Sequence, residues 1–401
     1  MSTYALRVLT CAFTVSSIGC TSQVRNTDFV SDNQIEGRES LPSEHSESSS
    51  ELVSSSALDY HLEDGWNRLP DPPLKGRVNA VVTTAQAKLI VVGGRDLLCP
   101  PASDCGFGES EMFLDGAFYD IEREEWAEIS DAPFAFEGGA AAVVDDEIYL
   151  FGRCSVVDNC PENQLLHYNI TTDTWDTIQT PFETIGFSLI SVPGHLVAYQ
   201  RSTSGTGVVS DYLYDIGSDE WTPITADPLG ETTDRTGFSD ESGWILFGKG
   251  ADGSSDDATL VATYDIRLQR WAKRASTNQV GYQIWQSDND YYLSPHFSDA
   301  EGGVYSLLDN EWGPFPAVPE TELAGLVSER KASYVSTYGW IRDTRADEWV
   351  YVEPRQNSKG AFGESVSSGP LNSLVVFGGQ RWVANEGELL NETWLWLPPT
   401  L

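Results

Sequence analysis

Tryptophan recurs along this chain at intervals too regular for chance, and this period limits the possible folds more than any other feature. Successive gaps are 60, 49, 46, 50, 41 and 37 residues, and the series is Trp66, Trp126, Trp175, Trp221, Trp271, Trp312 and Trp349. A repeat of about 40–50 residues is typical of an array of small sheets in which each unit packs on its neighbours. The sequence therefore predicts an architecture more closely than it predicts an activity.

Each repeat also has a fixed internal order. An Asp or Asn stands six residues before five of these tryptophans, and a Tyr precedes it in four of the five. The segments read YDIEREEW, YNITTDTW, YDIGSDEW, YDIRLQRW and RDTRADEW. Asp and Asn suit turns because their side chains accept hydrogen bonds from nearby backbone N–H groups. We interpret each segment as a strand ending at Tyr, a polar turn, and a strand starting at Trp.

Short apolar runs precede these segments, for example LIVVGGR (89–95), IYLFGRC (148–154) and LVVFGGQR (374–381). They are rich in β-branched and aromatic residues and are bounded by Gly, Pro and Asp, as strands are. A weaker run precedes most of them, so each unit supplies four strands. No segment of the repeat region has a sustained helical period. We predict an all-β fold of four-stranded sheets.

This order resembles the kelch repeat, in which an apolar strand ending in Gly-Gly is followed by Tyr-Asp and then by Trp. The resemblance covers residues 62–401, although the Gly-Gly pair is complete only at Gly93-Gly94 and Gly378-Gly379. It implies a kelch-type, galactose-oxidase-like β-propeller.

The two ends of the repeat region predict how the propeller closes. The first unit opens with a single Trp strand (65–70), and the last supplies three strands and stops at NETWLWLPP (391–399). The strand at Trp66 should therefore pair with the strand near Trp394 and remove the exposed edge. This arrangement predicts seven blades, and six is the alternative if residues 272–349 form one irregular blade.

The N-terminal part has a different character. Residues 1–19 hold one charge and a short apolar stretch, as in a signal peptide, and they run into Ser17-Ile18-Gly19-Cys20. This tetrapeptide resembles a bacterial lipobox, with Ser17 where Leu is usual, and implies lipidation of Cys20; an ordinary cleavage site is the alternative. Residues 20–61 are rich in Ser and Glu and predict a disordered tether with a root-mean-square span of about 35 Å. We expect an exported protein at the cell membrane or cell surface, of the secreted bacterial lipoprotein type.

The remaining cysteines agree with export. They form two pairs of equal spacing after the second strand of consecutive units: Cys99 with Cys105, and Cys154 with Cys160. Disulfides form in oxidising compartments, so we predict these two local bridges. No CxxC motif or neighbouring His indicates zinc, and we expect no metal and no cofactor.

The net charge of −37 disfavours nucleic acid as a partner. It also disfavours direct attraction to an anionic surface, so the membrane should be contacted only through the lipid anchor. We expect a monomer. Catalysis has little support: galactose oxidase needs a Tyr–Cys crosslink at its copper site, and the two disulfides leave no Cys for one.

One group of residues indicates a binding face. Basic residues recur where the second strand of a unit ends, at Arg95, Arg153, Arg201, Lys249 and Arg381, with His296 in the weaker fifth unit. The loops after these strands open on one face of a propeller, as do the segments that hold Arg77 and Arg235. An anionic ligand would be attracted to this mouth, and Trp382 could add an apolar surface. The alternative is that each cation is paired with a local acid.

Two classes of function follow. The first is a non-enzymatic binding module that engages a glycan or a protein through this loop face. The alternative is a carbohydrate-active enzyme with its site at the central channel. We favour the binding module, because 61 scattered acids make no recognisable catalytic pair.

Overall fold

The structure is a computed structural model, and it describes most of the repeat region. The described residues are 62–101, 103, 105, 110–153, 161–205, 210–240, 242–250, 259–279, 281, 283–287, 289–294, 302–317, 319, 330–331, 334–337, 340–343, 348–353, 355, 361–369, 373–384 and 386–398. Four of the predicted features lie outside these residues: the signal peptide, the tether, lipidation of Cys20 and the Cys154–Cys160 bridge. His296 lies outside them too.

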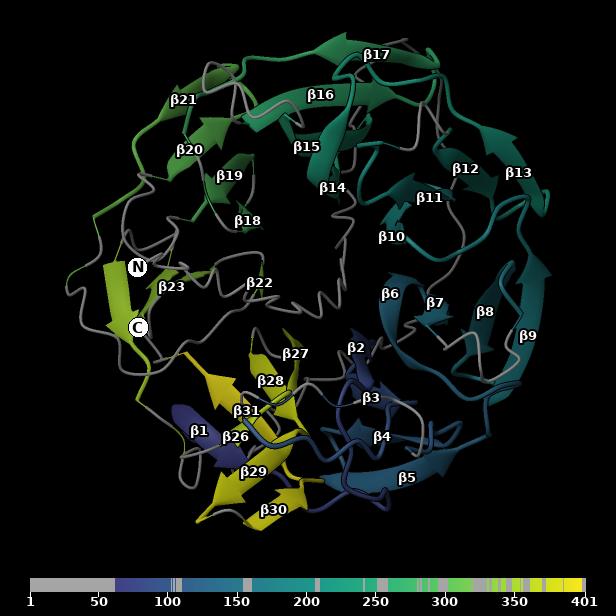
Figure 1. Cartoon of the computed structure of the whole chain (residues 1–401), viewed down its shortest axis with the longest axis vertical. Coiled ribbons are helices and arrows are strands. Elements are labelled where there is room, and N and C mark those ends of the chain that lie inside the picture. Colours follow the sequence, from purple (N-terminus) through teal and green to yellow (C-terminus); the bar gives the residue numbers. More distant parts are fainter. Residues whose placement is uncertain are drawn as a thin grey trace, which may run out of the picture.

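The described strands form seven four-stranded antiparallel sheets and one three-stranded sheet, with no helix among the described residues. We number the four-stranded sheets blades 1 to 7 in chain order. They lie side by side in a ring, and in each of the first blades the chain runs from an inner strand to an outer one (Figure 1). This arrangement confirms an all-β fold of the kelch-propeller type, while the number of blades in the ring stays a prediction.

The first three blades are regular. Blade 1 contains β2 (Val81–Ala85), β3 (Lys88–Val92), β4 (Gly116–Asp120) and β5 (Glu125–Ile129). Blade 2 contains β6 (Glu137–Val144), β7 (Glu147–Arg153), β8 (Gln164–Asn169) and β9 (Thr174–Gln179). Blade 3 contains β10 (Phe187–Val192), β11 (His195–Gln200), β12 (Tyr212–Asp215) and β13 (Glu220–Pro223).

The next three blades follow the same order. Blade 4 contains β14 (Thr232–Ser239), β15 (Gly243–Gly250), β16 (Thr259–Asp265) and β17 (Arg270–Lys273). Blade 5 contains β18 (Ile284–Ser287), β19 (Asp290–Leu293), β20 (Gly303–Ser306) and β21 (Glu311–Gly313). Blade 6 contains β22 (Arg330–Lys331), β23 (Tyr334–Thr337), β24 (Trp340–Asp343) and β25 (Glu348–Tyr351).

Blade 7 joins the two ends of the repeat region. Its strands are β27 (Ser365–Ser368), β28 (Leu374–Phe377), β31 (Thr393–Leu397) and β1 (Gly65–Arg68). β1 runs antiparallel to β31, with Trp66 opposite Trp396 and Arg68 opposite Trp394. The predicted closure by the strand at Trp66 is confirmed.

A second sheet accompanies blade 7, and the sequence had not indicated it. It consists of β26 (Ala361–Phe362), β29 (Gln380–Val383) and β30 (Glu386–Leu389), and its hairpin is inserted between β28 and β31. The Gln380 side chain accepts a hydrogen bond of 2.7 Å from the backbone of Cys99. Cys99 and Cys105 form the predicted disulfide. The inserted sheet therefore touches the disulfide loop of blade 1 beside the closure.

The Tyr-Asp…Trp segments are the outer hairpins of the blades. The Asp or Asn accepts bonds from backbone N–H groups of its turn, as Asp120 does from residues 122 and 123. Tyr and Trp then face each other across the hairpin, with ring centroids 4.7 Å apart for Tyr168 and Trp175. Burial and the nearby acids raise the pKa of Tyr119 to about 12, so this hydroxyl remains protonated. The predicted strand–turn–strand interpretation is confirmed for these hairpins.

The period of the tryptophans has a structural cause. The indole N–H of Trp175 in blade 2 donates to the carbonyl oxygen of Ser130, which follows the outer strand of blade 1, at 2.8 Å. The same bond to the preceding blade is made at 2.6–2.9 Å by Trp66, Trp126, Trp271 and Trp312. Each of these five Trp side chains therefore links its blade to the one before it, whereas the Trp221 indole N–H has no acceptor among the described residues.

The hydrophobic core lies between neighbouring blades. One cluster combines Ile90 of blade 1 with Leu150 of blade 2, and another combines Leu89 of blade 1 with Leu395 of blade 7. Fully burying one such side chain contributes about 1.5–3 kcal/mol. Among the described residues, blades 1 to 4 and blade 7 each contribute to clusters with both neighbouring blades, so apolar packing between blades stabilises the ring.

Candidate functional site

The structure places the predicted basic residues at the ends of the second strands, as the sequence indicated. Arg153 ends β7, Lys249 lies near the end of β15, and Arg201 directly follows β11. Arg95 and Arg381 each follow a Gly-Gly pair that comes after β3 or β28. The positions are equivalent, but the five side chains have different surroundings.

Three of these cations have acidic partners. Arg95 is 1% exposed and lies 3.3 Å from Glu137. Lys249 lies 2.9 Å from Asp234, and Arg381 lies 2.6 Å from Glu388. These three cations therefore fit the alternative to a binding face, in which each cation is paired with an acid. Trp382 is half-buried and its indole N–H donates to Gln380 at 3.1 Å.

Arg77 and Arg235 do not contribute to the mouth, contrary to the expectation from sequence. Arg77 is fully buried, forms two bonds to Asp115 and packs 4.2 Å from the centre of the Phe113 ring. Arg235 is buried between Asp211 and Asp227. Asp115 and Asp211 both directly precede the third strand of their blade. The sequence signal that was missed is an Asp at this repeat position together with an Arg near the next inner strand, Arg77 shortly before β2 and Arg235 within β14.

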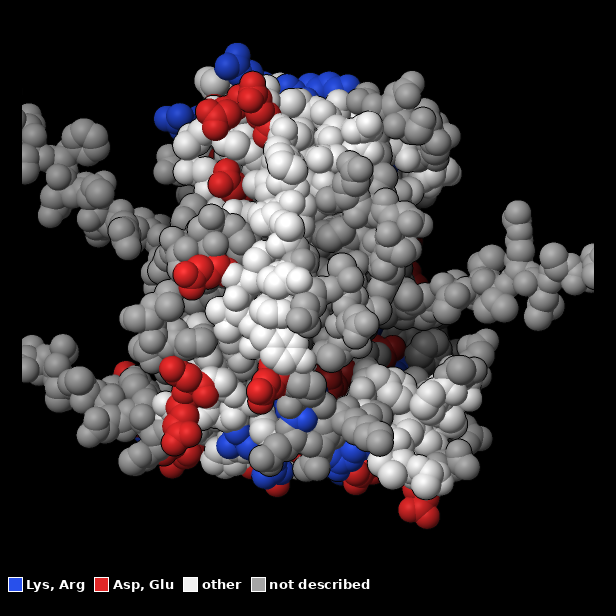
Figure 2. Space-filling model, turned by 90° about the vertical axis from the view of Figure 1, so that its left-hand side faces the viewer, with Lys and Arg blue, Asp and Glu red and all other residues white. Residues whose placement is uncertain are grey.

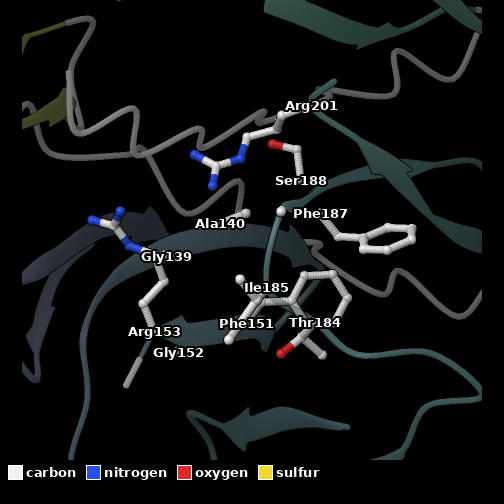
Figure 3. A pocket seen from close by; sticks show the side chains of 11 residues that line it. Gly139, Ala140, Phe151, Gly152, Arg153, Thr184, Ile185, Phe187, Ser188 and Arg201 are labelled. Atoms are coloured by element: carbon white, nitrogen blue, oxygen red, sulfur yellow. The ribbon is translucent and has the colours of Figure 1, made fainter. Parts of the chain in front are cut away.

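Arg153 and Arg201 differ from the other cations, because neither forms an ion pair within the described part of the chain. Both line one pocket between blades 2 and 3 (Figure 3). Arg201 is exposed, whereas Arg153 is half-buried. The structure therefore brings together two of the five predicted cations.

The pocket has an apolar wall and a few polar groups. The pocket is a shallow, open hollow, and the space of about 450 Å³ between its lining atoms includes open solvent. Phe151, Phe187 and Ile185 supply the apolar surface, and Thr184 and Ser188 add hydroxyl groups (Figure 3). Ile185 is 57% exposed and presents its apolar surface at the mouth of the pocket. Its two arginines are the only charged side chains among the lining residues that the structure describes.

Local backbone geometry makes room for Arg153. The pairing of β6 with β7 shifts register between Glu137 and Gly139, as in a β-bulge. Gly139 has φ 128°, and a Cβ there would lie 1.9 Å from the carbonyl oxygen of Phe151, so only glycine fits. Beside the bulge, the guanidinium group of Arg153 lies against Gly138 near the start of β6, where a Cβ would come within 2.7 Å of it.

The electrostatic surroundings of Arg153 are unfavourable to its charge. Burial lowers the pKa of Arg153, the neighbouring Arg201 lowers it further, and Glu137 opposes both. Its Nε atom is buried and has no acceptor among the described residues. Two cations thus lie close together beside an apolar wall, and an anion between them would relieve both effects.

The histidines of the described blades lie elsewhere. His167 stacks on Tyr149 at 4.6 Å, and its Nε2 lies 3.5 Å from Glu147. His195 lies 3.5 Å from Asp215. Within the described ranges no three His, Cys, Asp or Glu side chains are placed to hold a metal ion. No helix in those ranges has the length and apolar character needed to cross a membrane.

Comparisons with known proteins agree with the fold. Part of the chain is similar to Kelch-like protein 38 of Rattus norvegicus, with 27% identity over 165 residues, which is 38% of this chain and 26% of that protein. The protein of the same name from Mus musculus is 25% identical over 164 residues. The chain spans about a quarter of the length of these curated relatives. No protein-family model matches the chain. These weak similarities and the antiparallel four-stranded sheets fit a kelch β-propeller.

Proposed function

We propose that the chain is a non-enzymatic binding module whose kelch-type propeller engages an anionic group of a protein or glycan at the pocket between blades 2 and 3. The observation that carries this proposal is the pair Arg153 and Arg201, which line one pocket and form no ion pair with a described residue, Glu137 opposing the charge effects on Arg153 without an ion pair. The weak kelch-like similarity supports a protein-interaction role. The lining residues hold no carboxylate and no imidazole, which favours binding over acid–base chemistry.

The affinity would come chiefly from the two guanidinium groups. Arginine can donate two parallel hydrogen bonds to a carboxylate, and such charge-assisted bonds are roughly twice as strong as neutral ones. Each contributes about 1.5–3 kcal/mol. The rest of the acidic surface would repel an anion, so attraction is focused at this face. Phe151, Phe187 and Ile185 would pack against an apolar part of the same ligand.

The cellular setting that we propose is the outer side of a cell membrane or the cell surface. Lipidation of Cys20 would anchor the chain, and residues 21–61 would hold the propeller away from the bilayer. Anchoring of this kind needs more than one acyl chain to be stable. The Cys99–Cys105 disulfide supports an oxidising compartment.

Binding to an array of acidic peptides, acidic oligosaccharides and peptidoglycan fragments tests the proposal, with hexaglutamate and oligogalacturonate as probes in solution. Loss of one charge-assisted hydrogen bond costs about 1.5 kcal/mol, which corresponds to about a tenfold change in Kd. The R153A/R201A variant should therefore bind at least about tenfold more weakly. Its residual binding should also depend less on salt. K249A is the matched control, since Lys249 occupies the equivalent position in blade 4 but is paired with Asp234.

The result would contradict the proposal if the double variant bound every probe as tightly as the unchanged protein. Failure of all anionic probes to bind the unchanged protein would contradict it as well. Unfolding curves of the two variants show whether a loss of binding reflects a loss of structure.

A further inference from the structure

The outer hairpin of blade 4 concentrates positive charge in a strongly acidic chain. Residues 266–274, which we call the basic hairpin, hold four of the 24 Lys and Arg residues and no acid. The four are Arg267, Arg270, Lys273 and Arg274, of which the first three are exposed. Within the described ranges none of them pairs with an acid. Leu268 at the turn adds an apolar side chain that is 56% exposed.

The outer hairpin of blade 1 carries the opposite charge at the same repeat positions. In residues 121–129, the acidic hairpin, exposed glutamates lie four and one residues before the Trp and two residues after it. The basic hairpin has cations at these three positions, and the matching pairs are Glu122 with Arg267, Glu125 with Arg270, and Glu128 with Lys273. None of these three glutamates has an ion pair in the described part of the chain.

The hairpin fold does not require this charge. Blades 2, 3 and 5 make the same hairpin and have no cation at the three positions, where they carry Thr171, Thr174, Thr177, Gly217, Glu220, Pro223, Leu308, Glu311 and Pro314. Exposed strand edges are commonly protected by a charge of either sign. Protection alone therefore does not explain why one hairpin is basic and another acidic at matching positions.

Both hairpins lie where another molecule can reach them. β5 and β17 are the outermost strands of their blades, and each pairs with one strand only. They lie on well-separated sides of the ring (Figure 1). Figure 2 shows basic side chains along the upper edge of the molecule, the edge at which Figure 1 places β17. One molecule cannot bring its own two hairpins together.

We propose that the basic hairpin of one molecule docks against the acidic hairpin of a second copy. Because the two surfaces differ, the contact is heterologous and propagates head to tail. Exposed ion pairs are individually weak, and the net charge of −37 opposes association, so we still expect a monomer in dilute solution. Tethering to one surface would raise the effective concentration and favour chains of molecules. The higher effective concentration rests on the proposed lipid anchor, whereas the contact between the two hairpins does not depend on it.

Sedimentation velocity of the full chain carrying Cys20→Ala tests the contact without the lipid. Association should grow with protein concentration at about 10 mM salt, where the screening length is about 30 Å, and vanish at about 1 M, where it is about 3 Å. The charge reversals R267E/R270E/K273E and E122K/E125K/E128K should each abolish association. An equimolar mixture of these two variants should restore it, because one then has two basic hairpins and the other two acidic ones.

A matched control changes the net charge without touching either hairpin. E183K/E231K/E353K alters three exposed glutamates by the same total charge as E122K/E125K/E128K and should still associate. Should a triple variant fold poorly by circular dichroism, the single reversals E125K and R270E make the same comparison. A monomer at every concentration in low salt, or a mixture that fails to associate, would overturn the proposal. Loss of association with the basic variant alone would point to another acidic surface and would also overturn it.

Discussion

Replacing Arg235 by Met should destabilise the propeller more than any change at a surface ion pair. The Arg235 side chain is 1% exposed and lies 2.9 Å from Asp211 and 2.7 Å from Asp227, which are 5% and 9% exposed. It also donates to the carbonyl oxygen of Gln200 at 2.8 Å. The guanidinium group in β14 of blade 4 thereby holds the loops of blade 3. Its loss leaves two buried carboxylates without a counter-charge, which costs about 3–5 kcal/mol.

The pH dependence follows from the sign of the pKa shifts. Burial raises the pKa of Asp211, and Arg235 opposes this effect. R235M removes the opposing charge, so the folded-state pKa rises further above the unfolded value. A group with a raised folded-state pKa destabilises the fold when it is ionised and ceases to do so when it is protonated. The difference in stability between R235M and the unchanged protein should therefore shrink as the pH falls toward 3.8, the ordinary pKa of an Asp side chain.

Urea unfolding followed by tryptophan fluorescence measures the free energy of unfolding at each pH. The control is R68M, which breaks an exposed pair between Arg68 and Asp71, with side chains 44% and 52% exposed. Such pairs contribute about 0–1 kcal/mol. Adding D211N and D227N to R235M should recover part of the loss, because the uncompensated charges are then gone. If R235M costs no more than R68M, the reasoning about this buried triad is wrong.

Three further outcomes are expected. Trp175→Phe should lower the free energy of unfolding by about 1 kcal/mol, because the hydrogen bond to the preceding blade is lost. Trp221→Phe should cost less in the same urea unfolding experiment, since the Trp221 indole N–H has no acceptor among the described residues. Removing the Cys99–Cys105 bridge should lower the free energy of unfolding by about 2.4 kcal/mol in the chain-entropy model. Non-reducing peptide mapping should find Cys154–Cys160 as a second local bridge, and a peptide that links the two loops would contradict this pairing. Cys20→Ala should move the protein from the membrane to the soluble fraction, and a wild type that is already soluble would rule out the anchor.

The fold could be predicted from the sequence because its main contacts are local or periodic. Asp120 binds its own turn, and Tyr168 and Trp175 meet across one hairpin. The repeat spacing of Trp reflects a bond to the adjacent blade, so it is visible in the sequence. The inserted β26–β29–β30 sheet occurs once, and a feature without a repeat leaves no periodic signal.

The position of the candidate site could be predicted from the sequence, but which of its cations form ion pairs could not. The ends of the second strands are fixed by the repeat, so the face that carries Arg153 and Lys249 could be located. Whether a cation is neutralised depends on acids elsewhere in the chain, as Lys249 with Asp234 and Arg95 with Glu137 show. Nothing local in the sequence distinguishes Arg153, which has no such partner among the described residues, from Arg95, which has one.

The joining of β1 to β31 also sets an order of events during synthesis. Gly65 pairs with Leu397, so β1 has no partner until nearly the whole repeat region has been made. Blades 1 to 5 can form one after another from neighbouring segments, but blade 7 cannot form until its last strand is present. Contacts between such distant residues make folding slow and leave strand edges exposed meanwhile. Nascent chains are therefore most prone to aggregate before the ring closes, because the edges that β1 and β31 later cover are still unpaired.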